Sequence, residues 1–327
     1  MRIAYFLHGR GRGHASRSAP VIARLRQRGH QCQVFAGGDA LDILHGDEGL
    51  RPWAPTLPGA AMPRTLLRQY RAALTYLREE HVDLVVSDGD MPSLLAARTL
   101  GMRTLALGHD VVFSRCALPS GLDRGALWRQ RVNGVGTWLA AQAVAVHFLP
   151  IQPARPNTWV ARPDTRAMSA PSTTQPEEHL VAYFRDPNAA PFLDLLARRG
   201  PPLRLYGWRG EPIAGVEVRP FDQDAFAQDV ATARGVVGSS GSNLIAEALL
   251  LGKPLLALHA ARDAEQLLNA QLVAASGAGV RGCLDEPAQP AVDRFLDGLR
   301  AGSFRRVDTQ GMPPVSDVMV DVVERGS

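Results

Sequence analysis

A histidine ends a glycine-rich loop that directly follows the first apolar run of the chain. The loop occupies residues 8–14 and includes Gly11 and Gly13. Glycines allow a backbone to approach a ligand closely, and an imidazole changes charge near neutral pH. We therefore predict that His14 is a general base, with a surface histidine on a tight turn as the alternative.

The same loop matches a dinucleotide-binding fingerprint only in part. The G-x-G-x-x-G pattern requires a glycine where His14 stands, and an acid about 20 residues further on. The acid that ends the next predicted strand, Asp39, lies well beyond that spacing. The pattern therefore disfavours an NAD site, although the amides that open the following helix remain suited to an anion.

Two more polar residues follow predicted strands of the first half. Asp88 comes after the apolar run 82–87, and His109 comes after the strand 103–107. Carboxyl ends of parallel strands meet at one edge of a sheet, so we expect Asp88 to approach His14. Its carboxylate would fix the imidazole tautomer and stabilise the cation formed on proton uptake. The alternative is an aspartate that caps a helix or a turn.

Small and hydroxyl-bearing residues join a predicted strand to a predicted helix in the second half. Such a junction can bind a diphosphate through free amides, and a capped helix after a plain turn is the alternative. One helical turn further on, Glu247 could accept hydrogen bonds from sugar hydroxyls. The residues of the junction are Ser240, Gly241, Ser242 and Asn243.

An acid and an amide stand side by side at the start of a later helix. Glu265 and Gln266 follow the strand 254–258, and together they could bind vicinal hydroxyls. An ordinary acidic first turn is the alternative interpretation.

Short apolar strands alternate with amphipathic helices along nearly the whole chain. This βαβ rhythm predicts the α/β class with parallel sheets and right-handed crossovers. A Pro-, Ser- and Thr-rich stretch at 151–179 interrupts the rhythm and is interpreted as a linker plus a loop. We predict two tandem Rossmann-like, doubly wound domains that face a central cleft, residues 1–165 and 166–327. The last helix is expected to return to the first domain.

Composition bounds the remaining possibilities. The 327 residues include 46% hydrophobic and 21% charged residues, which excludes a disordered or fibrous protein. The net charge of +4 invites a nucleic-acid interpretation, but the basic residues are spread along the chain and Lys253 is the single lysine. Three scattered cysteines predict reduced thiols, and no targeting or membrane-spanning segment is visible. A cytoplasmic protein is expected, with attachment to the inner membrane face left open.

Three motifs in this order resemble glycosyltransferases of the GT-B fold. Gly13-His14-Ala-Ser-Arg17 is similar to the loop of UDP-glycosyltransferases and of the N-acetylglucosaminyltransferases that form lipid II. The segment 241–247 followed by Gly-Lys-Pro is similar to their donor motif. Glu265-Gln266-x-x-Asn-Ala is similar to their sugar signature. The chain is most similar to short bacterial and archaeal members.

The resemblance implies a role for each matching residue. His14 is the implied base, with Asp88 as its partner, and Gly11, Gly13, Arg17 and His109 are assigned to an acceptor or phosphate loop. The implied donor residues hold the diphosphate, the ribose, the sugar and, at Phe221, the nucleobase. They are Ser240, Gly241, Ser242, Asn243, Glu247, Glu265, Gln266 and Phe221.

We therefore predict an inverting, metal-independent glycosyltransferase without a cofactor. Retaining enzymes of this fold commonly carry a second glutamate eight residues before the ribose glutamate, where this chain has Ser239. The donor is expected to be UDP-glucose or UDP-GlcNAc, and no stable protein partner is predicted. A nucleotide-sugar epimerase and a non-catalytic nucleotide-sugar or DNA-binding protein are the alternatives.

The acceptor is left open among a lipid, a small metabolite and a modified nucleic acid. A lipid acceptor would favour an exposed apolar patch in the first half, and residues of two predicted loops are candidates. Burial in the core is the alternative for each of them. The candidates are Trp53, Leu57, Val111, Val112 and Phe113.

Overall fold

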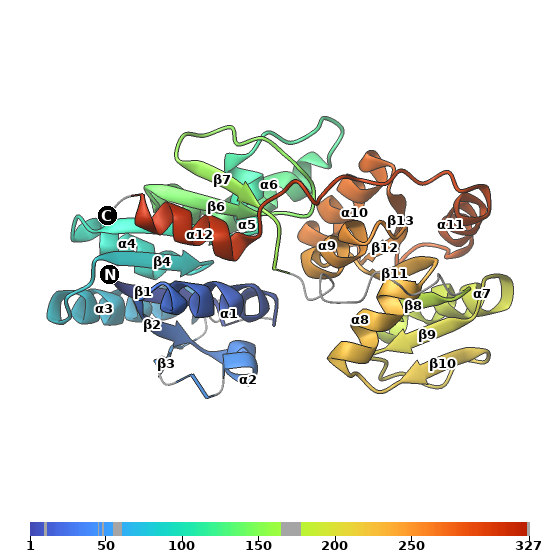
Figure 1. Ribbon diagram of the computed structural model, residues 1–327, viewed down its shortest axis with the longest axis horizontal. Helices are drawn as coiled ribbons and strands as arrows, with labels where there is room; N and C mark the ends of the chain where they lie inside the picture. Colours follow the sequence, from blue (N-terminus) through green and yellow to red (C-terminus); the bar gives the residue numbers. More distant parts are fainter. Residues whose placement is uncertain (10–11, 45, 48, 55–60, 165–177, 326–327) are drawn as a thin grey trace. The chain divides into compact units, whose positions relative to one another are not determined.

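The computed structural model describes residues 1–9, 12–44, 46–47, 49–54, 61–164 and 178–325, and the chain forms two compact units. The first unit comprises Met1–Leu118, Arg129–Asp164 and Met312–Ser327, and the second comprises Pro119–Trp128 and Thr165–Gly311. Each unit has its own parallel sheet with helices on both faces (Figure 1). The predicted α/β class with two Rossmann-like sheets is confirmed.

The sheet of the first unit runs in the order β3-β2-β1-β4-β5-β6-β7, and every described pairing is parallel. The order reverses between β1 and β4, so this is the switch point of a doubly wound sheet, where ligands of such folds bind. The strands are β1 (Arg2–Leu7), β2 (Gln31–Ala36), β3 (Leu50–Pro52), β4 (Leu84–Asp88), β5 (Arg103–Gly108), β6 (Gln142–Val146) and β7 (Thr158–Ala161).

The helices of the first unit cover both faces of this sheet (Figure 1). One of them, α6, is divided between the units: its residues up to Trp128 belong to the second unit, and those from Arg129 belong to the first. They are α1 (Arg12–Gln27), the 3₁₀ helix η1 (Gly38–Ala40), α2 (Leu41–Leu44), α3 (Met62–Glu79), α4 (Met91–Thr99), α5 (Asp110–Arg115), α6 (Arg124–Asn133), the 3₁₀ helix η3 (Gly134–Leu139) and α12 (Val315–Glu324).

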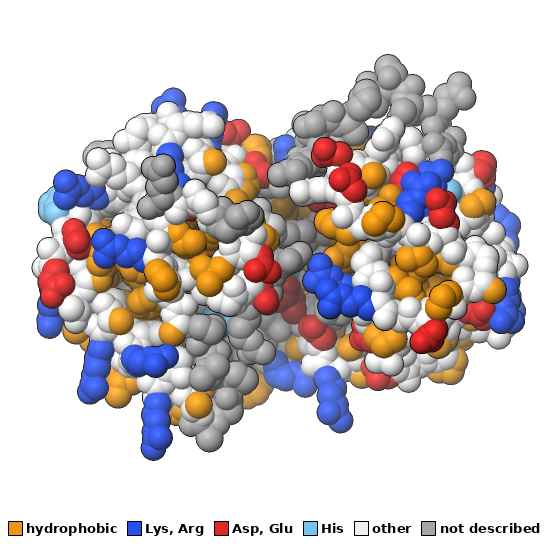
Figure 2. All heavy atoms as spheres, turned by 90° about the horizontal axis from the view of Figure 1, so that it is seen from below, with side chains coloured by type: hydrophobic (Ala, Val, Ile, Leu, Met, Phe, Trp, Pro, Cys, Tyr) orange, Lys and Arg blue, Asp and Glu red, His pale blue; other side chains and the backbone are white. Residues whose placement is uncertain are grey.

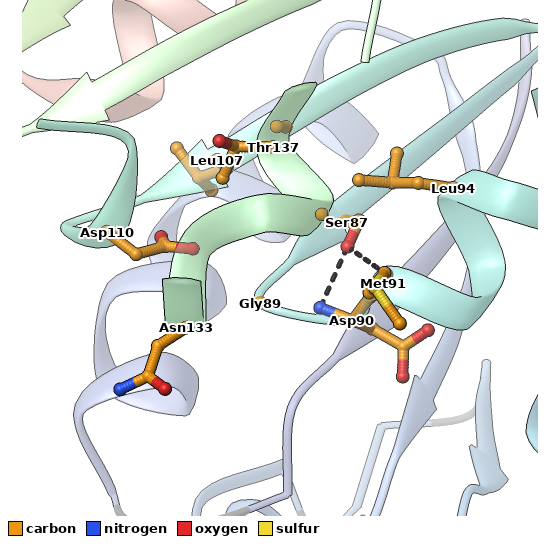
Figure 3. A pocket seen from close by; sticks show the side chains of 11 residues that line it. Ser87, Gly89, Asp90, Met91, Leu94, Leu107, Asp110, Asn133 and Thr137 are labelled. Atoms are coloured by element: carbon orange, nitrogen blue, oxygen red, sulfur yellow. Dashed lines mark hydrogen bonds between the residues drawn. The ribbon is translucent and has the colours of Figure 1, made fainter. Parts of the chain in front are cut away.

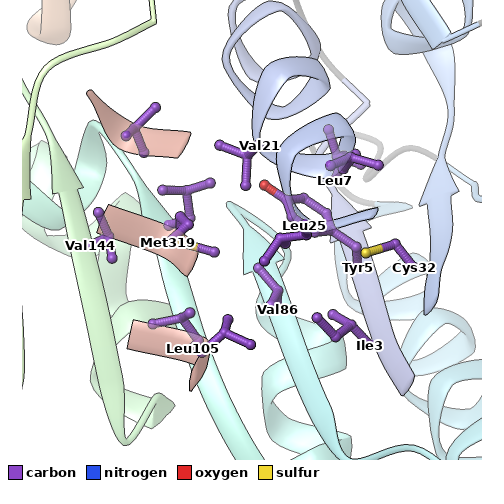
Figure 4. Packing of buried hydrophobic residues seen from close by; sticks show 14 of the residues in the cluster. Ile3, Tyr5, Leu7, Val21, Leu25, Cys32, Val86, Leu105, Val144 and Met319 are labelled. Carbon is purple, nitrogen blue, oxygen red and sulfur yellow. The ribbon is translucent and has the colours of Figure 1, made fainter. Parts of the chain in front are cut away.

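Alternation along the strands divides the core of the first unit into two layers. Tyr5 and Val86 face one side, where Leu25 of α1 and Met319 of α12 cover them (Figure 4). Phe6 faces the other side, where α3 and α4 pack. Since successive strand residues point to opposite faces, the apolar run of each strand is buried on both sides.

The last helix is fixed to the first unit by polar contacts as well as by packing. The Asp164 carboxylate accepts hydrogen bonds from the Ser316 amide at 3.0 Å and from its hydroxyl at 2.8 Å. Arg162 forms a parallel bridge with Pro314, and α12 then packs along α1. These bonds satisfy donors at the start of α12 that have no partner within the helix.

The sheet of the second unit runs in the order β10-β9-β8-β11-β12-β13, again with parallel pairings. Its elements are β8 (Leu180–Tyr183), the 3₁₀ helix η5 (Pro187–Ala189), α7 (Ala190–Arg199), β9 (Leu203–Tyr206), β10 (Val216–Arg219), α8 (Gln223–Thr232), β11 (Gly235–Ser239), α9 (Ser242–Leu250), β12 (Leu255–His259), α10 (Ala264–Ser276), β13 (Gly279–Cys283) and α11 (Gln289–Ala301).

Two expectations about the first half are wrong. The stretch 151–179 contains β7, which pairs with β6, so its described part is not wholly linker and loop. Four of the residues suggested for an exposed apolar patch are core, because α5 and the chain near β3 pack onto the sheet; Leu57 lies outside the described residues. The buried four are Trp53, Val111, Val112 and Phe113.

Charge and hydropathy give no sign of a membrane span or of one large cationic field. On the face in Figure 2, arginine and acidic side chains are interspersed with apolar and neutral ones. Within the described ranges, no helix is both long and apolar enough to cross a membrane. Cys32, Cys116 and Cys283 are unbonded and buried, as the scattered cysteines indicated.

A buried histidine makes stability depend on pH. His147, directly after β6, is fully buried, and neither ring nitrogen has a hydrogen-bond partner among the described residues. Its ring lies 4.1 Å from that of Phe148 and 5.2 Å from that of His109. Burial, together with His109, lowers the pKa of His147 well below its ordinary value.

We expect the protein to lose stability as the pH falls below about 6.5. In this range His147 binds a proton in the unfolded chain but stays neutral in the folded protein. His147→Leu should remove this loss, which is at most about 1.4 kcal/mol per pH unit. Urea unfolding at pH 7.5 and 5.5 measures it. His81→Gln, at a largely exposed histidine, is the control and should keep the wild-type pH dependence. If His147→Leu lost stability between pH 7.5 and 5.5 as much as the wild type does, buried His147 would not be the cause of the pH dependence.

Candidate active site and donor site

His14 and Asp88 meet at the switch point of the first sheet. Asp88 is the last residue of β4, and His14 lies in the first turn of α1, which follows the neighbouring strand β1. His14 Nδ1 is 2.7 Å from Asp88 Oδ1. The carboxylate is fully buried, whereas the imidazole keeps 25% of its surface exposed. The structure therefore brings together the two residues that sequence reasoning paired.

The geometry decides which imidazole nitrogen carries the proton. An unprotonated Nδ1 would place a lone pair 2.7 Å from a carboxylate oxygen, which is repulsive. Arg17 Nη2 also lies 2.8 Å from Nδ1, but it donates to Asp88 Oδ1 at 2.6 Å, so we assign the Nδ1 hydrogen to Asp88 and the free lone pair to Nε2. Nε2 has no hydrogen-bond partner within the described part of the chain. This is the tautomer that a general base requires.

Arg17 and Ser18 complete the environment of the carboxylate. Arg17 donates from Nε to Asp88 Oδ2 at 2.8 Å and from Nη2 to Oδ1 at 2.6 Å. The Ser18 hydroxyl donates to Oδ2 at 2.9 Å and accepts a hydrogen bond from Tyr5. Arg17 and Ser18 stand three and four positions after His14, so one face of α1 presents all three.

These partners keep Asp88 ionised inside the protein. Burial alone would raise the pKa of Asp88, but the charges of Arg17 and His14 and their hydrogen bonds hold it well below its usual range. Arg17 is 6% exposed and bonds to Asp88, so it belongs to the buried hydrogen-bond network around this carboxylate. The sequence analysis had instead assigned Arg17 to an acceptor or phosphate loop. The position of Arg17 one helical turn after His14 was the sequence signal for this contact. Sequence reasoning did not identify Ser18.

A glycine turn next to Asp88 leaves room for the imidazole. Gly89 has φ +76°, and a Cβ there would lie 3.0 Å from His14 Cε1. A side chain would be strained by the backbone and would push the base. Gly13 has open space around it, whereas Gly11 lies outside the described residues.

His109 does not line a site in this structure. It is 3% exposed, its Nδ1 lies 3.0 Å from the Val146 carbonyl oxygen, and its ring packs against Phe113 and Phe148. α5 folds over the end of β5 and covers this residue, and its place in an acceptor or phosphate loop stays a prediction.

A small pocket lies on the other side of Gly89. It is lined by Ser87, Met91 and Asp110, among others, with the Ser87 hydroxyl bonded to the Asp90 backbone (Figure 3). Its volume of about 20 Å³ is enough for about one water molecule. The pocket can therefore take a single polar group, not a whole acceptor.

In the second unit, β11 leads through Ser240 and Gly241 into α9. Ser240 is fully buried; its hydroxyl donates to the Leu258 carbonyl, and its own carbonyl accepts from Asn269. The Ser240 side chain thus braces the loop against β12 and α10 and is not available to a diphosphate. Gly241 caps α9 without a side-chain hydrogen bond, and the positive end of the helix dipole at this terminus favours an anion.

Glu247 lies on α9, and its carboxyl is unusual in its lack of partners and in its pKa. Its carboxyl forms no hydrogen bond or ion pair within the residues described, and burial raises the pKa of Glu247 to about 7. A largely buried carboxyl without a partner is costly, so its presence near the open end of α9 fits a group that meets a ligand.

Glu265 and Gln266 begin α10, as the sequence indicated. The helix is capped by Asp263, whose carboxylate accepts from the Gln266 amide at 3.0 Å. Both side chains remain partly exposed. Asn269 of the same motif is buried and holds the Ser240 carbonyl at 2.9 Å, so this residue shapes the α9 loop.

Phe221 follows β10 and is 52% exposed, and its ring packs edge-on against Tyr183 at 5.6 Å. Buried Asp229 anchors the strand before it, since it accepts from Arg219 at 2.7 Å and from the Tyr206 hydroxyl. An exposed aromatic ring on an anchored loop can stack on a nucleobase. Sequence reasoning did not identify Asp229, because its partners come from separate strands.

Comparisons with known proteins define the class of this fold. The chain is similar to the crystal structure of Acinetobacter baumannii MurG (19% identity, 99% of each chain covered, TM-score 0.66). It is also similar to that of the glycosyltransferase SnogD from Streptomyces nogalater (19% identity, 99% of each chain, TM-score 0.65). These likenesses identify the two-unit architecture as the GT-B fold of glycosyltransferases.

Sequence comparison goes one step further. The model of glycosyl transferase family 1 matches residues 58–300, and the chain belongs to this family. It is a glycosyltransferase. A relative from Methylobacterium nodulans is 28% identical over 303 residues, which is 81% of this chain and 79% of that protein. That relative is a UDP-N-acetylglucosamine–N-acetylmuramyl-(pentapeptide) pyrophosphoryl-undecaprenol N-acetylglucosamine transferase.

The raised pKa of Glu247 predicts a destabilising contribution at neutral and alkaline pH. Between about pH 4.5 and 7 the folded carboxyl keeps a proton that the unfolded chain has lost, so its contribution to stability falls as the pH rises through this range. Above pH 7, Glu247→Gln should be more stable than wild type by up to about 3 kcal/mol.

Urea unfolding at pH 8 and pH 5 measures this difference, which should shrink at the lower pH. Glu211→Gln, at an exposed glutamate, is the matched control and should change stability little at either pH. A gain in Glu247→Gln that does not depend on pH would show that Glu247 is charged in the folded protein.

Proposed function

We propose that this glycosyltransferase moves a sugar from a nucleotide diphosphate sugar to an acceptor hydroxyl with inversion and without a metal ion. The observation that carries the proposal is the His14–Asp88 pair, with the exposed Nε2 of His14 ready to take a proton. The acceptor hydroxyl gives its proton to Nε2 while its oxygen attacks the anomeric carbon. Asp88 stabilises the imidazolium that forms.

The donor is proposed to bind to the second unit. Ser242 and Asn243 at the start of α9 are assigned to the leaving diphosphate, and the helix dipole stabilises its negative charge in place of a metal ion. Glu247 is assigned to the ribose, Glu265 and Gln266 to the sugar, and Phe221 to the base. Inversion is supported by Ser239, which stands where a second glutamate would support retention.

The relatives favour particular substrates. The relative from Methylobacterium nodulans uses UDP-N-acetylglucosamine and a pyrophosphoryl-undecaprenol acceptor, so we propose a UDP-sugar donor and a lipid-carried acceptor hydroxyl at the cytoplasmic face of a membrane. Incubation of UDP-N-acetylglucosamine without an acceptor tests the epimerase alternative, since epimerisation needs the donor alone.

Loss of the base should stop the reaction but not donor binding. His14→Ala is expected to lower kcat by about 10²- to 10⁴-fold, because deprotonation of the acceptor loses its catalyst. Calorimetric affinity for UDP should change little, since the donor residues lie in the second unit. NMR of the wild-type product should show an inverted anomeric configuration. Full turnover by His14→Ala would refute the base, and a retained configuration would refute inversion.

Variants of Gln266 and Glu247 should distinguish binding of the sugar from binding of the nucleotide. Gln266→Ala should weaken the UDP-sugar by about tenfold and leave UDP nearly unchanged, because an unpaired sugar hydroxyl is worth on the order of 1–3 kcal/mol. Glu247→Ala should weaken both ligands. Titrations of UDP and the UDP-sugar by calorimetry compare the two variants. Equal losses for both ligands in Gln266→Ala would show that this residue does not contact the sugar.

A further inference from the structure

An exposed arginine follows β8, a central strand of the second sheet. Arg185 stands two residues after the end of this strand, and its side chain forms no hydrogen bond or ion pair within the part of the chain that the structure describes. The adjacent Asp186 has another role, since its carboxylate accepts a hydrogen bond from the Asn188 amide and caps η5. The charge of Arg185 therefore does not serve to hold the described fold together.

The strand order places Arg185 at the switch point of the second sheet. The order β10-β9-β8-β11-β12-β13 reverses between β8 and β11, and doubly wound sheets bind ligands at the carboxyl ends of the strands at such a point. Tyr183 of β8 pairs with Gly238 of β11. Two residues further along, Arg185 follows β8 and Ser240 follows β11. Arg185 therefore lies beside the loop that leads into α9.

Arg185 also lies on the face of the sheet that α9 covers. Phe184 packs into the core with α7 and α11, so Tyr183 before it faces the other side. The Arg185 guanidinium lies 5.7 Å from the Tyr183 ring, which keeps it on that side. Leu244 of α9 fills the space beside Gly238 on the same side. Arg185 and the start of α9 thus share one face and one end of the sheet.

The segment that leads into α9 contains no cation of its own. Residues 238–243 are glycine, serine and asparagine. A helix N-terminus carries about half a positive charge, and a nucleoside diphosphate carries more negative charge than that. Lys253, after the end of α9, is partly buried and donates to the Ala233 carbonyl oxygen at 2.8 Å. Arg185 is exposed at the correct end of the sheet and can supply the charge that the helix lacks.

The aromatic neighbours of Arg185 connect it to the nucleotide. The Tyr183 ring, on which the guanidinium lies, is 5.6 Å from the ring of Phe221, the residue assigned to the nucleobase. The contact with Tyr183 orients a side chain that would otherwise rotate freely. A guanidinium presents its donors in a planar fork that binds two phosphate oxygens at once. Its shape and charge therefore suit the diphosphate of the donor better than the uncharged base.

We propose that Arg185 is a further catalytic residue, which binds the diphosphate of the donor and stabilises the charge that develops on it. As the acceptor oxygen bonds to the anomeric carbon, the bond from that carbon to the diphosphate oxygen breaks, and its electron pair stays on the leaving oxygen. The acceptor proton goes to His14, while Arg185 stays protonated. The proposal rests on the proposed function, because the leaving group is a diphosphate only when the donor is a nucleotide diphosphate sugar.

Binding of uridine and of UDP separates a phosphate contact from a base contact. Arg185→Gln should weaken UDP by about 10- to 100-fold, because charge-assisted hydrogen bonds are lost, and should leave uridine unchanged. Arg185→Lys should recover part of the loss, since it restores the charge without the fork. Calorimetry measures UDP, and ligand NMR titration measures the weaker uridine.

Arg294→Gln is the matched control. Arg294 is an exposed arginine of α11, on the other face of the same sheet, and its loss should leave UDP binding as in the wild type. Added salt should weaken UDP binding more in the wild type than in Arg185→Gln. In the transfer assay Arg185→Gln should lower kcat as well as raise KM for the UDP-sugar, because the leaving oxygen is more negative in the transition state. Circular dichroism melting checks that each variant is folded.

Several results would overturn the proposal. Equal UDP affinity in Arg185→Gln and the wild type would remove Arg185 from the site and leave the proposed transfer intact. Equal losses for uridine and UDP would assign Arg185 to the base, and an equal loss in Arg294→Gln would show an effect of overall charge. UDP binding that depends on Arg185 in a protein that transfers no sugar would refute the proposed function alone.

Discussion

The buried carboxylate of Asp88 is the constraint around which the first unit is arranged. A charge at the end of a central strand is tolerated only where it is paired and hydrogen-bonded. Arg17 and Ser18 supply that compensation from one face of α1, so the helix can occupy only one rotation over the sheet. His14, three residues before Arg17, is then oriented without further help. The glycine after Asp88 is needed for the same reason, since the imidazole occupies the space of a side chain.

The largely buried carboxyl of the second unit, that of Glu247, differs from Asp88 in its hydrogen-bond partners. Asp88 is satisfied by the protein itself, and its pKa is held well below the usual range. Glu247 receives no such partners among the described residues, and its pKa is raised to about 7 by burial. The first arrangement fixes the imidazole and the carboxylate in one geometry, whereas the second leaves the Glu247 carboxyl without a hydrogen bond among the described residues. Ser240 and Asn269 meanwhile tie the loop before α9 to β12 and α10, so the start of α9 is held in place by two buried hydrogen bonds.

Sequence reasoning predicted what depends on local pattern. Apolar runs located most of the strands, and the geometry of strand ends was enough to pair Asp88 with His14. It did not predict β7, because a four-residue edge strand between prolines has no periodicity to recognise. It left open whether Trp53 and Val111 are exposed or buried, because exposure is decided by which helices pack over a loop. Ser240 and His109 were assigned to ligands from their positions after strands and from the family resemblance, whereas the hydrogen-bond partners seen here, Leu258 and Val146, lie on neighbouring strands.

The contact between Arg17 and the catalytic pair has a chemical consequence. Arg17 Nη2 lies 2.8 Å from His14 Nδ1 as well as 2.6 Å from Asp88 Oδ1. The carboxylate charge is therefore shared, and a protonated imidazole would face a guanidinium at contact distance. The arginine that makes a buried Asp88 possible therefore also contacts the imidazole, so the position of His14 and the burial of Asp88 depend on the same ion pair.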